Sequence, residues 1–579
     1  MPPPSPGVWG SSPRKENSVN FLDVTRANVA RADPRNGVCF LRYGKPNVEM
    51  PYDAFLRTSA WLGRKIPEDA TVVIAADDPL PALLAFFGAL WTGGRPLILP
   101  SPHAAGGMEQ FQTQVRRTLG VVQGEVVLAL QDGIAVESPG VPVVPLPADA
   151  DGYDTLAPGD LPESAGPGGD TVAFLQATSA STGDPKLIGI THANVCANLT
   201  TIERKLGRNG DERLVTWLPL YHDMGLVGMA LLGAFRGWPL YVMKPIEFVM
   251  RPHTWIDALS RYRGTLIAAP TFGYDHVRRK VAPEDVPGCD LSALRTAVVG
   301  AEPIRLDTLD GFHRRFAPAG LRAGALVCGY GMAETTLAAA LSEVDAPPRY
   351  VLVDPAGVET GAPVRLLGEG VLGGPPPGGP GIPVFSCGPP LDGMTAALID
   401  EEGRPVEGDA ILGEITLTGP NIAAGYLDPD TGAPRPFPDG VLRTGDLGFR
   451  QRGELFVLER RKHVIIRNGR NHLASLLEER VAGILGRPVQ EVMVLDADIY
   501  DPGSEIVAVV EHCPARFELD GARRRALRTL DLPVDSLHLA RRRVIPRTTS
   551  GKKRYHTARR RLADGTLRAD TTVALAGAR

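Results

Sequence analysis

The sequence predicts an α/β protein in two parts, a large domain of helix-covered β-sheets followed by a small C-terminal domain. Three observations lead to this prediction. The chain has 579 residues, more than one hydrophobic core usually organises. Short β-rich runs alternate with helical patterns, which is typical of parallel sheets covered by helices. After about residue 458 the chain becomes rich in arginine, so we place the domains at 1–459 and 460–579.

The strand–helix alternation can be followed along the chain. The run TVVIAA leads into a helical pattern over 80–91, and PLILP follows it. The runs TVAFLQA, LVTWLPL, PLYVM, GTLIAAP and LRTAVVG are further candidates for buried strands. Residues 366–381, LLGEGVLGGPPPGGPG, are too rich in glycine and proline for a regular element and are expected to form a surface loop. The whole of 349–381 is interpreted as an insertion on a compact body.

Composition and charge argue against several classes of protein. A hydrophobic fraction of 43% and a charged fraction of 22% are typical of a soluble globular protein. The net charge of −4 argues against a general binder of nucleic acids or anionic membranes, which needs a basic excess. Six scattered cysteines without a CxxC pair indicate neither a zinc site nor a disulfide framework, and they favour the reducing cytoplasm.

Neither a membrane span nor a signal peptide is predicted. The most apolar stretch, PLPALLAFFGALWTGGRPLILP, contains proline, glycine and arginine. It therefore indicates a buried helix, a turn and a strand. The N-terminal residues lack the apolar core of a signal peptide.

The run QATSASTGDPKLIGITHANV gathers hydroxyls, a glycine and a lysine. Ser179, Ser181 and Thr182 offer hydroxyl donors, Gly183 lets backbone N–H groups approach an anion, and Lys186 adds a mobile cation. The run does not match the nucleotide P-loop, because no glycine stands at the required distance before the lysine. It indicates either a phosphate-binding loop or a plain polar turn after a buried strand.

Two further stretches place polar or small residues after a buried run. In TWLPLYHDMGLVG, His222 and Asp223 stand between a buried run and a glycine. They could serve chemistry, or the histidine could simply stand hydrogen-bonded at a helix start that Asp223 caps. In VVGAEPI a strand runs into a tight turn of small residues, where a flat ring could lie against the backbone. An ordinary strand–turn–helix is the alternative.

Three stretches in the second half carry candidate ligands. In CGYGMAETTL, Tyr330 supplies an aromatic face and Glu334 an oxygen ligand suited to Mg²⁺, or a carboxylate stabilised by a helix dipole. In LRTGDLGF, Asp446 could accept from two ribose hydroxyls, or simply stand in a β-turn. In RTTSGKKR, Lys552 stands on a glycine-flanked loop or in a solvated basic tail.

Taken together and in this order, these stretches resemble the adenylate-forming superfamily of acyl-CoA synthetases, nonribosomal adenylation domains and luciferases. The likeness runs from about residue 40 to 565. The stretches WLPLYHDMGL, GAEPIR, YGMAETTL, RTGDLGF, GELFV and GRNH are most similar to the fatty acyl-AMP ligase branch. That branch has an insertion shortly after YGMAETT, where 349–381 stand, which is taken to restrain domain rotation and so disfavour CoA ligation.

The resemblance implies a small mobile α+β C-terminal lid domain and a reaction that uses ATP and Mg²⁺. A fatty or other bulky hydrophobic carboxylic acid would become an acyl-adenylate, with release of pyrophosphate. The adenylate would pass to an acyl carrier protein or a separate transferase, and the basic C-terminal stretch would suit an acidic carrier or be merely solvated. An acyl-CoA ligase, an enzyme that adenylates another oxyanion, and a non-adenylating protein that binds acyl-adenylate are the alternatives.

The resemblance also implies a role for each site residue. Lys552 would bridge the substrate carboxylate and the α-phosphate, His222 would lie beside that carboxylate, and Glu334 would ligate Mg²⁺. Lys462 occupies the hinge position. The residues that bind ATP and AMP would be Thr178, Ser179, Ser181, Thr182, Gly183, Lys186, Gly300, Ala301, Glu302, Tyr330, Gly331, Met332, Ala333, Thr335, Asp446 and Arg460.

The chain departs from the family pattern in the loop and at the hinge. The loop usually reads TSGSTGxPKG, and Ala180 and Leu187 stand here for two glycines. An alanine held at positive φ costs about 1 kcal/mol. The hinge usually reads GRxKD, and Glu459 and His463 stand here for Gly and Asp. The residues expected to carry the chemistry are retained, so we expect an active enzyme with a specialised substrate.

Overall fold

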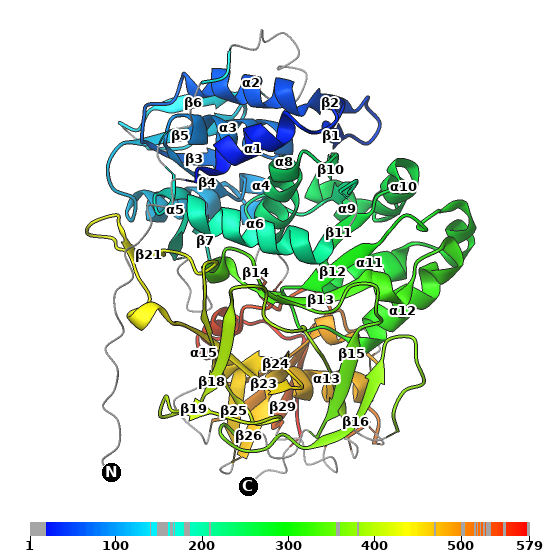
Figure 1. Ribbon diagram of the computed structural model, residues 1–579. Coiled ribbons are helices and arrows are strands. Elements are labelled where there is room, and N and C mark those ends of the chain that lie inside the picture. Colours follow the sequence, from blue (N-terminus) through cyan, green and yellow to red (C-terminus); the bar gives the residue numbers. More distant parts are fainter. Residues whose placement is uncertain are drawn as a thin grey trace, which may run out of the picture.

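Figure 1 shows the computed structural model of the chain. The described residues are 19–138, 140–147, 160–162, 166, 168–178, 186–207, 210–354, 359–378, 381–467, 470–498, 504–514, 517, 519–521, 523–524, 527, 534–547 and 552–575. The predicted loop residues Ser179, Ala180, Ser181, Thr182 and Gly183 lie outside them.

An eight-stranded sheet, in the order β14-β13-β12-β11-β9-β10-β1-β2, is central to the larger part. Its six inner strands pair in parallel, which confirms the α/β prediction, and both edge strands pair antiparallel. The strands are β14 (Ala338–Leu341), β13 (Leu326–Gly331), β12 (Thr296–Gly300), β11 (Leu266–Pro270), β9 (Leu214–Thr216), β10 (Leu240–Met243), β1 (Gly37–Leu41) and β2 (Val48–Pro51).

A second, four-stranded parallel sheet contains β4 (Arg95–Leu99), β3 (Thr71–Ala75), β5 (Val126–Gln131) and β6 (Val143–Leu146). Its side chains alternate between two cores, as the two-residue period of a strand requires. Val72 and Ile74 face the main core, whereas Val73 faces a smaller core shared with β7. The predicted buried helix is α3 (Pro79–Trp91), all of whose residues are buried.

A four-stranded antiparallel sheet, in the order β22-β21-β8-β7, carries the lysine of the predicted phosphate loop. Its strands are β22 (Pro434–Arg435), β21 (Gly425–Leu427), β8 (Leu187–Thr191) and β7 (Val172–Ala177). The Thr178 N–H donates to the Lys186 carbonyl at 2.8 Å, so the two ends of the loop lie side by side. Leu187 is buried in the core between this sheet and β5, which accounts for its replacement of the usual glycine.

Helices cover these sheets, and their bounds follow from local sequence signals. Helix α6 begins with a capping box, in which Thr191 and Asn194 exchange side-chain and backbone hydrogen bonds. Besides α3, the α-helices described in the larger part are α1 (Phe21–Val29), α2 (Tyr52–Gly63), α4 (Pro102–Ala105), α5 (Met108–Leu119), α6 (His192–Leu206), α7 (Asp223–Gly225), α8 (Leu232–Arg236), α9 (Pro245–Met250), α10 (His253–Tyr262), α11 (Thr271–Lys280) and α12 (Leu306–Phe316). A π-helical turn, Leu226–Leu231, joins α7 to α8.

Two further antiparallel sheets are formed by strands between residues 349 and 460. One has five strands, β19 (Pro405–Val406), β18 (Thr395–Ile399), β20 (Gly413–Thr418), β23 (Leu442–Gln451) and β24 (Glu454–Arg460). The other has three, β16 (Leu366–Val371), β15 (Arg349–Val353) and β17 (Ile382–Phe385).

The prediction of a loop over 366–381 is wrong for Leu366–Val371, which forms β16. Gly370 pairs with Tyr350 in that register, and a Cβ at Gly370 would lie 2.5 Å from the tyrosine ring. The aromatic ring thus covers the glycine across the strand pair, which compensates for the missing side chain. That 349–381 is an insertion stays a prediction.

The C-terminal elements, coloured orange to red in Figure 1, lie beside β15, β23 and β24. They comprise β25 (Val464–Arg467), β26 (Arg470–Leu473), α13 (Ala474–Leu485), β27 (Val492–Asp496), β28 (Ile506–Val510), β29 (Ser536–Leu539), α15 (Tyr555–Ala563) and β30 (Thr571–Ala574). They share their own hydrophobic core, whose members run from Ile465 to Leu575. A domain boundary at 459/460 stays a prediction. None of the helices within the described ranges has the length and hydropathy needed to cross a membrane.

Candidate active site

The predicted site residues of the larger part follow the carboxyl ends of parallel strands. His222 comes after β9, Glu302 follows β12, and Tyr330 stands at the end of β13. Phe272, which was not predicted, is the second residue of α11, directly after β11. Ligands of open α/β sheets bind outside the carboxyl ends of the strands. The fold therefore brings four separate sequence stretches to one edge of the eight-stranded sheet.

The turn after β12 is shaped by small residues. A Cβ on Gly300 would lie 2.8 Å from the Gly329 carbonyl oxygen of the neighbouring strand, so only glycine fits there. Ala301 has φ of 65°, in the left-handed region that residues with a Cβ rarely adopt. Non-glycine residues in this region cluster at functional sites. Glu302 is held behind the turn, where its carboxylate accepts from the Phe272 N–H at 3.2 Å.

Asp446, Tyr330 and Arg460 form a compact polar group. The Tyr330 hydroxyl donates to one carboxylate oxygen of Asp446 at 2.7 Å, and Arg460 Nε lies 2.8 Å from the other. Arg460 faces Asp446 directly in the antiparallel register of β23 and β24. Burial raises the pKa of Tyr330 well above its ordinary value, and the charge of Asp446 adds to the shift, so the tyrosine stays a neutral donor.

The turn from Gly331 to Thr335 presents Glu334. Met332 N–H donates to the Thr335 hydroxyl at 3.2 Å, and this hydroxyl donates back to the Met332 carbonyl at 2.9 Å. A Cβ on Gly331 would lie 1.8 Å from the Leu337 carbonyl oxygen, so the turn requires glycine there. Ala333 is buried beneath the turn, whereas Glu334 is half-buried.

Tyr426 of β21 connects Glu334 to the phosphate-loop lysine. Its hydroxyl donates to the Glu334 carboxylate at 2.5 Å, and Lys186 Nζ lies 4.9 Å from the centre of its ring. The sequence analysis missed Tyr426, because nothing in its local sequence, AAGYL, distinguishes it from a core aromatic residue. Its role depends on a strand pairing between β21 and β8 that no local pattern indicates.

A group of cations faces the two carboxylates of the site. Desolvation lowers the pKa of Lys462, and the neighbouring charges of Arg460 and Lys186 lower it further, whereas Asp446 opposes the shift. These three cations therefore lie within electrostatic range of one another, although Arg460 and Lys462 come more than 270 positions after Lys186 in the chain. Such a group suits a polyphosphate.

His222 and Asp223 form a half-buried pair. The imidazole Nδ1 lies 2.7 Å from Asp223 Oδ1, which also accepts from the Met224 N–H at 2.7 Å. Burial raises the pKa of Asp223, but the charges of His222 and Lys552 outweigh it, so the pKa lies below its ordinary value. The charge of Lys552 also lowers the pKa of Glu302, although burial leaves that pKa raised overall. The charge of this C-terminal lysine therefore acts on both acids of the larger part.

The residues present suit a magnesium ion held together with a substrate. Mg²⁺ usually binds one or two protein carboxylates plus substrate phosphates and water. Glu334 offers one carboxylate, with one of its two oxygens bonded to Tyr426. Within the described part of the chain no cluster of three or more His, Cys, Asp or Glu residues would hold a metal alone. A metal here would need the phosphates of a nucleotide as further ligands.

Comparison with known proteins adds three findings. Residues 52–427 match the family model of the AMP-binding enzymes. The chain is 34% identical over 431 residues to the medium-chain-fatty-acid–[acyl-carrier-protein] ligase JamA of Moorena producens, with 69% of each chain covered. It is 31% identical over 547 residues to the long-chain-fatty-acid–AMP ligase FadD26 of Mycobacterium marinum, with coverage of 88% of this chain and 90% of the relative.

A solved structure supports the same fold. A chain from structural and functional studies of fatty acyl-adenylate ligases from E. coli and L. pneumophila matches with a TM-score of 0.78. The match covers 96% of this chain and 99% of that chain at 24% sequence identity. At this identity the likeness shows the fold, including the small C-terminal part.

Proposed function

This chain belongs to the AMP-binding enzyme family and, within it, to the fatty acyl-AMP ligase branch, and we propose the following reaction for its site. The enzyme activates a fatty or other bulky hydrophobic carboxylic acid as an acyl-adenylate and releases pyrophosphate from ATP. The observation that carries the proposal is the position of Lys552. The charge of this lysine of the C-terminal part acts on Asp223 and Glu302 of the larger part, which follow the carboxyl ends of β9 and β12.

The nucleotide is held by its base and its ribose. The adenine lies against the backbone of Gly300 and Ala301 and the ring of Tyr330. The ribose hydroxyls donate to Asp446, whose carboxylate is already oriented by Tyr330 and Arg460. Because both partners are in place before the nucleotide binds, little reorganisation is needed, and this rigidity places the α-phosphate reproducibly.

The phosphates are held by the cations of the site. Lys186, with the hydroxyls and amides of its loop, takes the β- and γ-phosphates, and Lys462 and Arg460 add further positive charge. Glu334 would hold Mg²⁺, and Tyr426 fixes the orientation of that carboxylate. When bound, Mg²⁺ neutralises phosphate charge and stabilises the crowded phosphorus as a Lewis acid.

The reaction joins two anions. A carboxylate oxygen of the acid attacks the α-phosphorus, a new phosphorus–oxygen bond forms, and the bond to the β-phosphate oxygen breaks as pyrophosphate leaves. Lys552 bridges the carboxylate and the α-phosphate and offsets their repulsion, and His222 lies beside the carboxylate. Removing one such preorganised group typically costs on the order of 10²–10³ in rate.

The acyl chain lies against the apolar turn Leu226–Leu231. This turn follows His222 directly, all six of its residues are buried, and it contacts β9 and β11. Its backbone is π-helical, a conformation that is frequent at functional sites. The ring of Phe272, which lies at the edge of the site, packs against Trp217 on the same side.

The acceptor is the thiol of an acyl carrier protein or of a separate transferase partner. Relatives whose names specify carrier-protein ligation support this acceptor, as does the basic C-terminal stretch, which suits an acidic carrier. The insertion over 349–381 disfavours a CoA thioester. We place the reaction in the cytoplasm, in keeping with six cysteines that form no disulfide.

The proposal is tested by acid-dependent pyrophosphate release over a panel of fatty and polycyclic carboxylic acids. Each acid is assayed alone, with CoA and with a phosphopantetheinylated carrier protein. We expect release with one class of acid, thioester formation on the carrier, and none on CoA. A CoA thioester would move the protein to the acyl-CoA ligases. Binding of a preformed acyl-adenylate without any release would instead identify a non-adenylating binding protein.

A further inference from the structure

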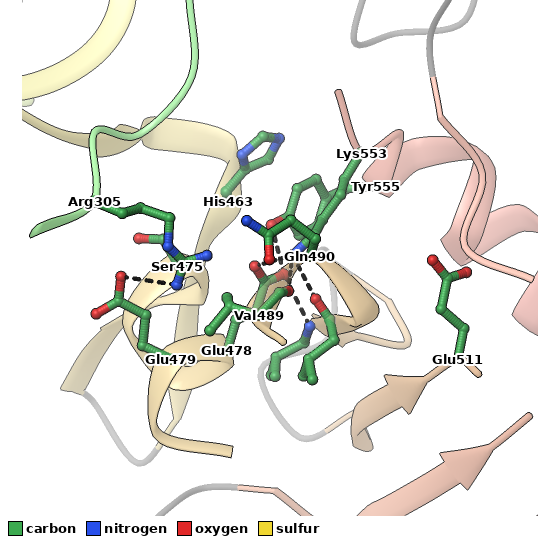
Figure 2. A network of polar contacts seen from close by, with 12 residues as sticks. Arg305, His463, Ser475, Glu478, Glu479, Val489, Gln490, Glu511, Lys553 and Tyr555 are labelled. Carbon is green, nitrogen blue, oxygen red and sulfur yellow. Dashed lines mark hydrogen bonds and ion pairs between the residues drawn. The ribbon is translucent and has the colours of Figure 1, made fainter. Parts of the chain in front are cut away.

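Lys553, the residue after Lys552, lies in a polar network inside the C-terminal part (Figure 2). Its ammonium group donates to the Glu478 carboxylate at 2.5 Å, to the Val489 carbonyl at 3.1 Å and to the Val492 carbonyl. All three donor positions of the lysine are therefore used by acceptors from α13, from the turn Val489–Glu491 and from the first residue of β27. Burial lowers the pKa of Lys553, and the charge of Glu478 opposes that shift.

Glu478 is the centre of this network. Its other carboxylate oxygen accepts from the Tyr555 hydroxyl at 2.7 Å and from the Val494 N–H at 3.1 Å. Glu478 is 4% exposed, so the partners of its carboxylate replace water almost completely. Lys553 and Tyr555 stand on either side of residue 554, and both are anchored by the same buried acid.

Lys552 is followed by the anchored residues Lys553 and Tyr555, and Arg547, which precedes it in the chain, is anchored in the same way. Arg547 donates to the Gln490 carbonyl at 2.6 Å and to the buried carboxylate of Glu511. Arg547 and Lys553 also pair across an antiparallel bridge. The segment that carries Lys552 is therefore held at both of its ends by side chains that point into the C-terminal part.

The network continues to the hinge through the two residues that depart from the family pattern. The ring of Tyr555 packs against the His463 imidazole, with centroids 4.1 Å apart and an interplanar angle of 30°. His463 Nδ1 lies 3.4 Å from the Glu459 carboxylate. Glu459 is buried and also accepts from the Ser475 N–H at 2.9 Å. The glutamate and the histidine that replace Gly and Asp thus form one complementary pair.

A contact with the larger part lies at the edge of the same network. Arg305, which follows the adenine turn after β12, donates to Glu479 of α13 at 3.3 Å (Figure 2). Glu479 neighbours Glu478 in the chain, so α13 contacts the larger part through one acid and anchors Lys553 through the next. The orientation of the lid and the placement of Lys552 therefore depend on one helix.

Stability alone does not account for a buried lysine at this position. A buried ion pair is often no more stabilising than an apolar pair of the same volume. An ammonium with three acceptors, however, fixes the backbone on either side of it in a way that an apolar side chain cannot. From this geometry we propose that Lys553, held by Glu478, is a positioning residue that sets the location of Lys552 at the reacting carboxylate. This inference rests on the proposed function of Lys552.

Steady-state kinetics of Lys553→Met test the proposal. A displacement of about 1 Å at a reacting group costs on the order of 10²-fold in rate. We therefore expect kcat for acid-dependent pyrophosphate release to fall about 10²-fold, with KM for ATP within about twofold of the parent, since the nucleotide residues are untouched. Asp535→Asn is the matched control. It removes a different ion pair of the C-terminal part, in which Arg467 lies 2.7 Å from Asp535.

A double variant separates positioning from folding. In Lys553→Met/Glu478→Gln the side chain at position 478 is neutral, so no buried charge is left without a partner. The thermal midpoint should therefore recover relative to the single variant. We expect kcat to stay low, because neither new side chain fixes the backbone next to Lys552. Recovery of kcat together with the thermal midpoint would overturn the proposal. A loss of kcat in Asp535→Asn as large as that in Lys553→Met would also overturn it.

Amide hydrogen exchange gives a readout that needs no acid substrate. The wild-type enzyme should protect the amides of residues 552–556, and Lys553→Met should lose that protection while β27 to β29 keep theirs. Unchanged protection in the variant would overturn the positioning role. A wild-type enzyme that protects this segment but releases no pyrophosphate with any acid would refute the proposed function of the site instead.

Discussion

Replacement of Asp446 by asparagine gives the sharpest prediction for the nucleotide site. Asp446 is 5% exposed, and each oxygen of its carboxylate already has one donor, from Tyr330 and from Arg460. Hydrogen bonds to a charged group contribute about 1.5–3 kcal/mol each. Because the carboxylate is shared, we take the lower figure for each of the two ribose hydroxyls, which sums to about 3 kcal/mol. This free energy corresponds to roughly 150-fold in affinity.

The asparagine variant keeps the shape of the side chain and one acceptor oxygen. One neutral hydrogen bond, worth about 1 kcal/mol, should then remain, which corresponds to roughly fivefold in affinity. Isothermal titration of ATP and of 2′,3′-dideoxy-ATP, without acid, measures the difference directly. Wild-type enzyme should prefer ATP by roughly 150-fold and Asp446→Asn by only about fivefold.

Glu414→Gln serves as the matched control. Glu414 lies on the neighbouring strand β20, is also 5% exposed, and pairs with Arg443 at 2.7 Å. The Glu414→Gln variant should lose stability in the same way as Asp446→Asn, yet keep the wild-type preference for ATP over 2′,3′-dideoxy-ATP. A preference in Asp446→Asn that equals the wild-type value would refute the assignment of Asp446 to the ribose.

Three further predictions concern the adenine turn, the hinge and the metal. Gly300→Ala should lower the free energy of unfolding by about 1–3 kcal/mol, because the new Cβ would lie 2.8 Å from a backbone carbonyl oxygen. Gly288→Ala is the control and should leave the free energy of unfolding unchanged, because nothing lies within 4 Å of its new Cβ. Equal urea midpoints for the two variants would contradict this prediction. Burial raises the pKa of Glu459, but His463 and Ser475 lower it below its ordinary 4.5. Its contribution is therefore complete above about pH 4.5 and is lost as the pH falls through the lowered pKa, so Glu459→Gln should flatten the acid limb of the thermal midpoint against pH. Glu334→Gln should raise the Mg²⁺ concentration needed for half-maximal rate, because an amide ligand carries no charge, and an unchanged Mg²⁺ dependence would exclude Glu334 as the ligand.

The parallel strands could be predicted from sequence because the signal is local. Runs such as GTLIAAP are continuous, apolar and bounded by turns, and this one became β11 with both neighbours parallel. The strand β16 could not be predicted, because its glycines are typical of a loop, and the ring of Tyr350 that covers Gly370 comes from a different strand. Local composition therefore predicts a strand only where the strand does not depend on a partner that is distant in sequence.

The candidate site shows the same division. Asp446 and Tyr330 were predicted from motifs, but their mutual hydrogen bond joins residues 116 positions apart. Tyr426 and Lys553 were missed, since a tyrosine and a lysine carry no signal of their own until tertiary packing sets their partners. The pairing of Glu459 with His463 likewise became visible only in the structure, where two separate departures from a family pattern prove to be in contact.

The measurement that tests the central claim most directly is the acyl-adenylate itself. Enzyme, ATP, Mg²⁺ and the best acid of the panel are mixed without acceptor, and the acyl-adenylate per enzyme is measured by mass spectrometry for wild type and Lys552→Ala. The account predicts about one acyl-adenylate per wild-type site and formation slowed on the order of 10²–10³-fold in the variant. Equal rates of formation in the two proteins, or no adenylate with any acid, would contradict it.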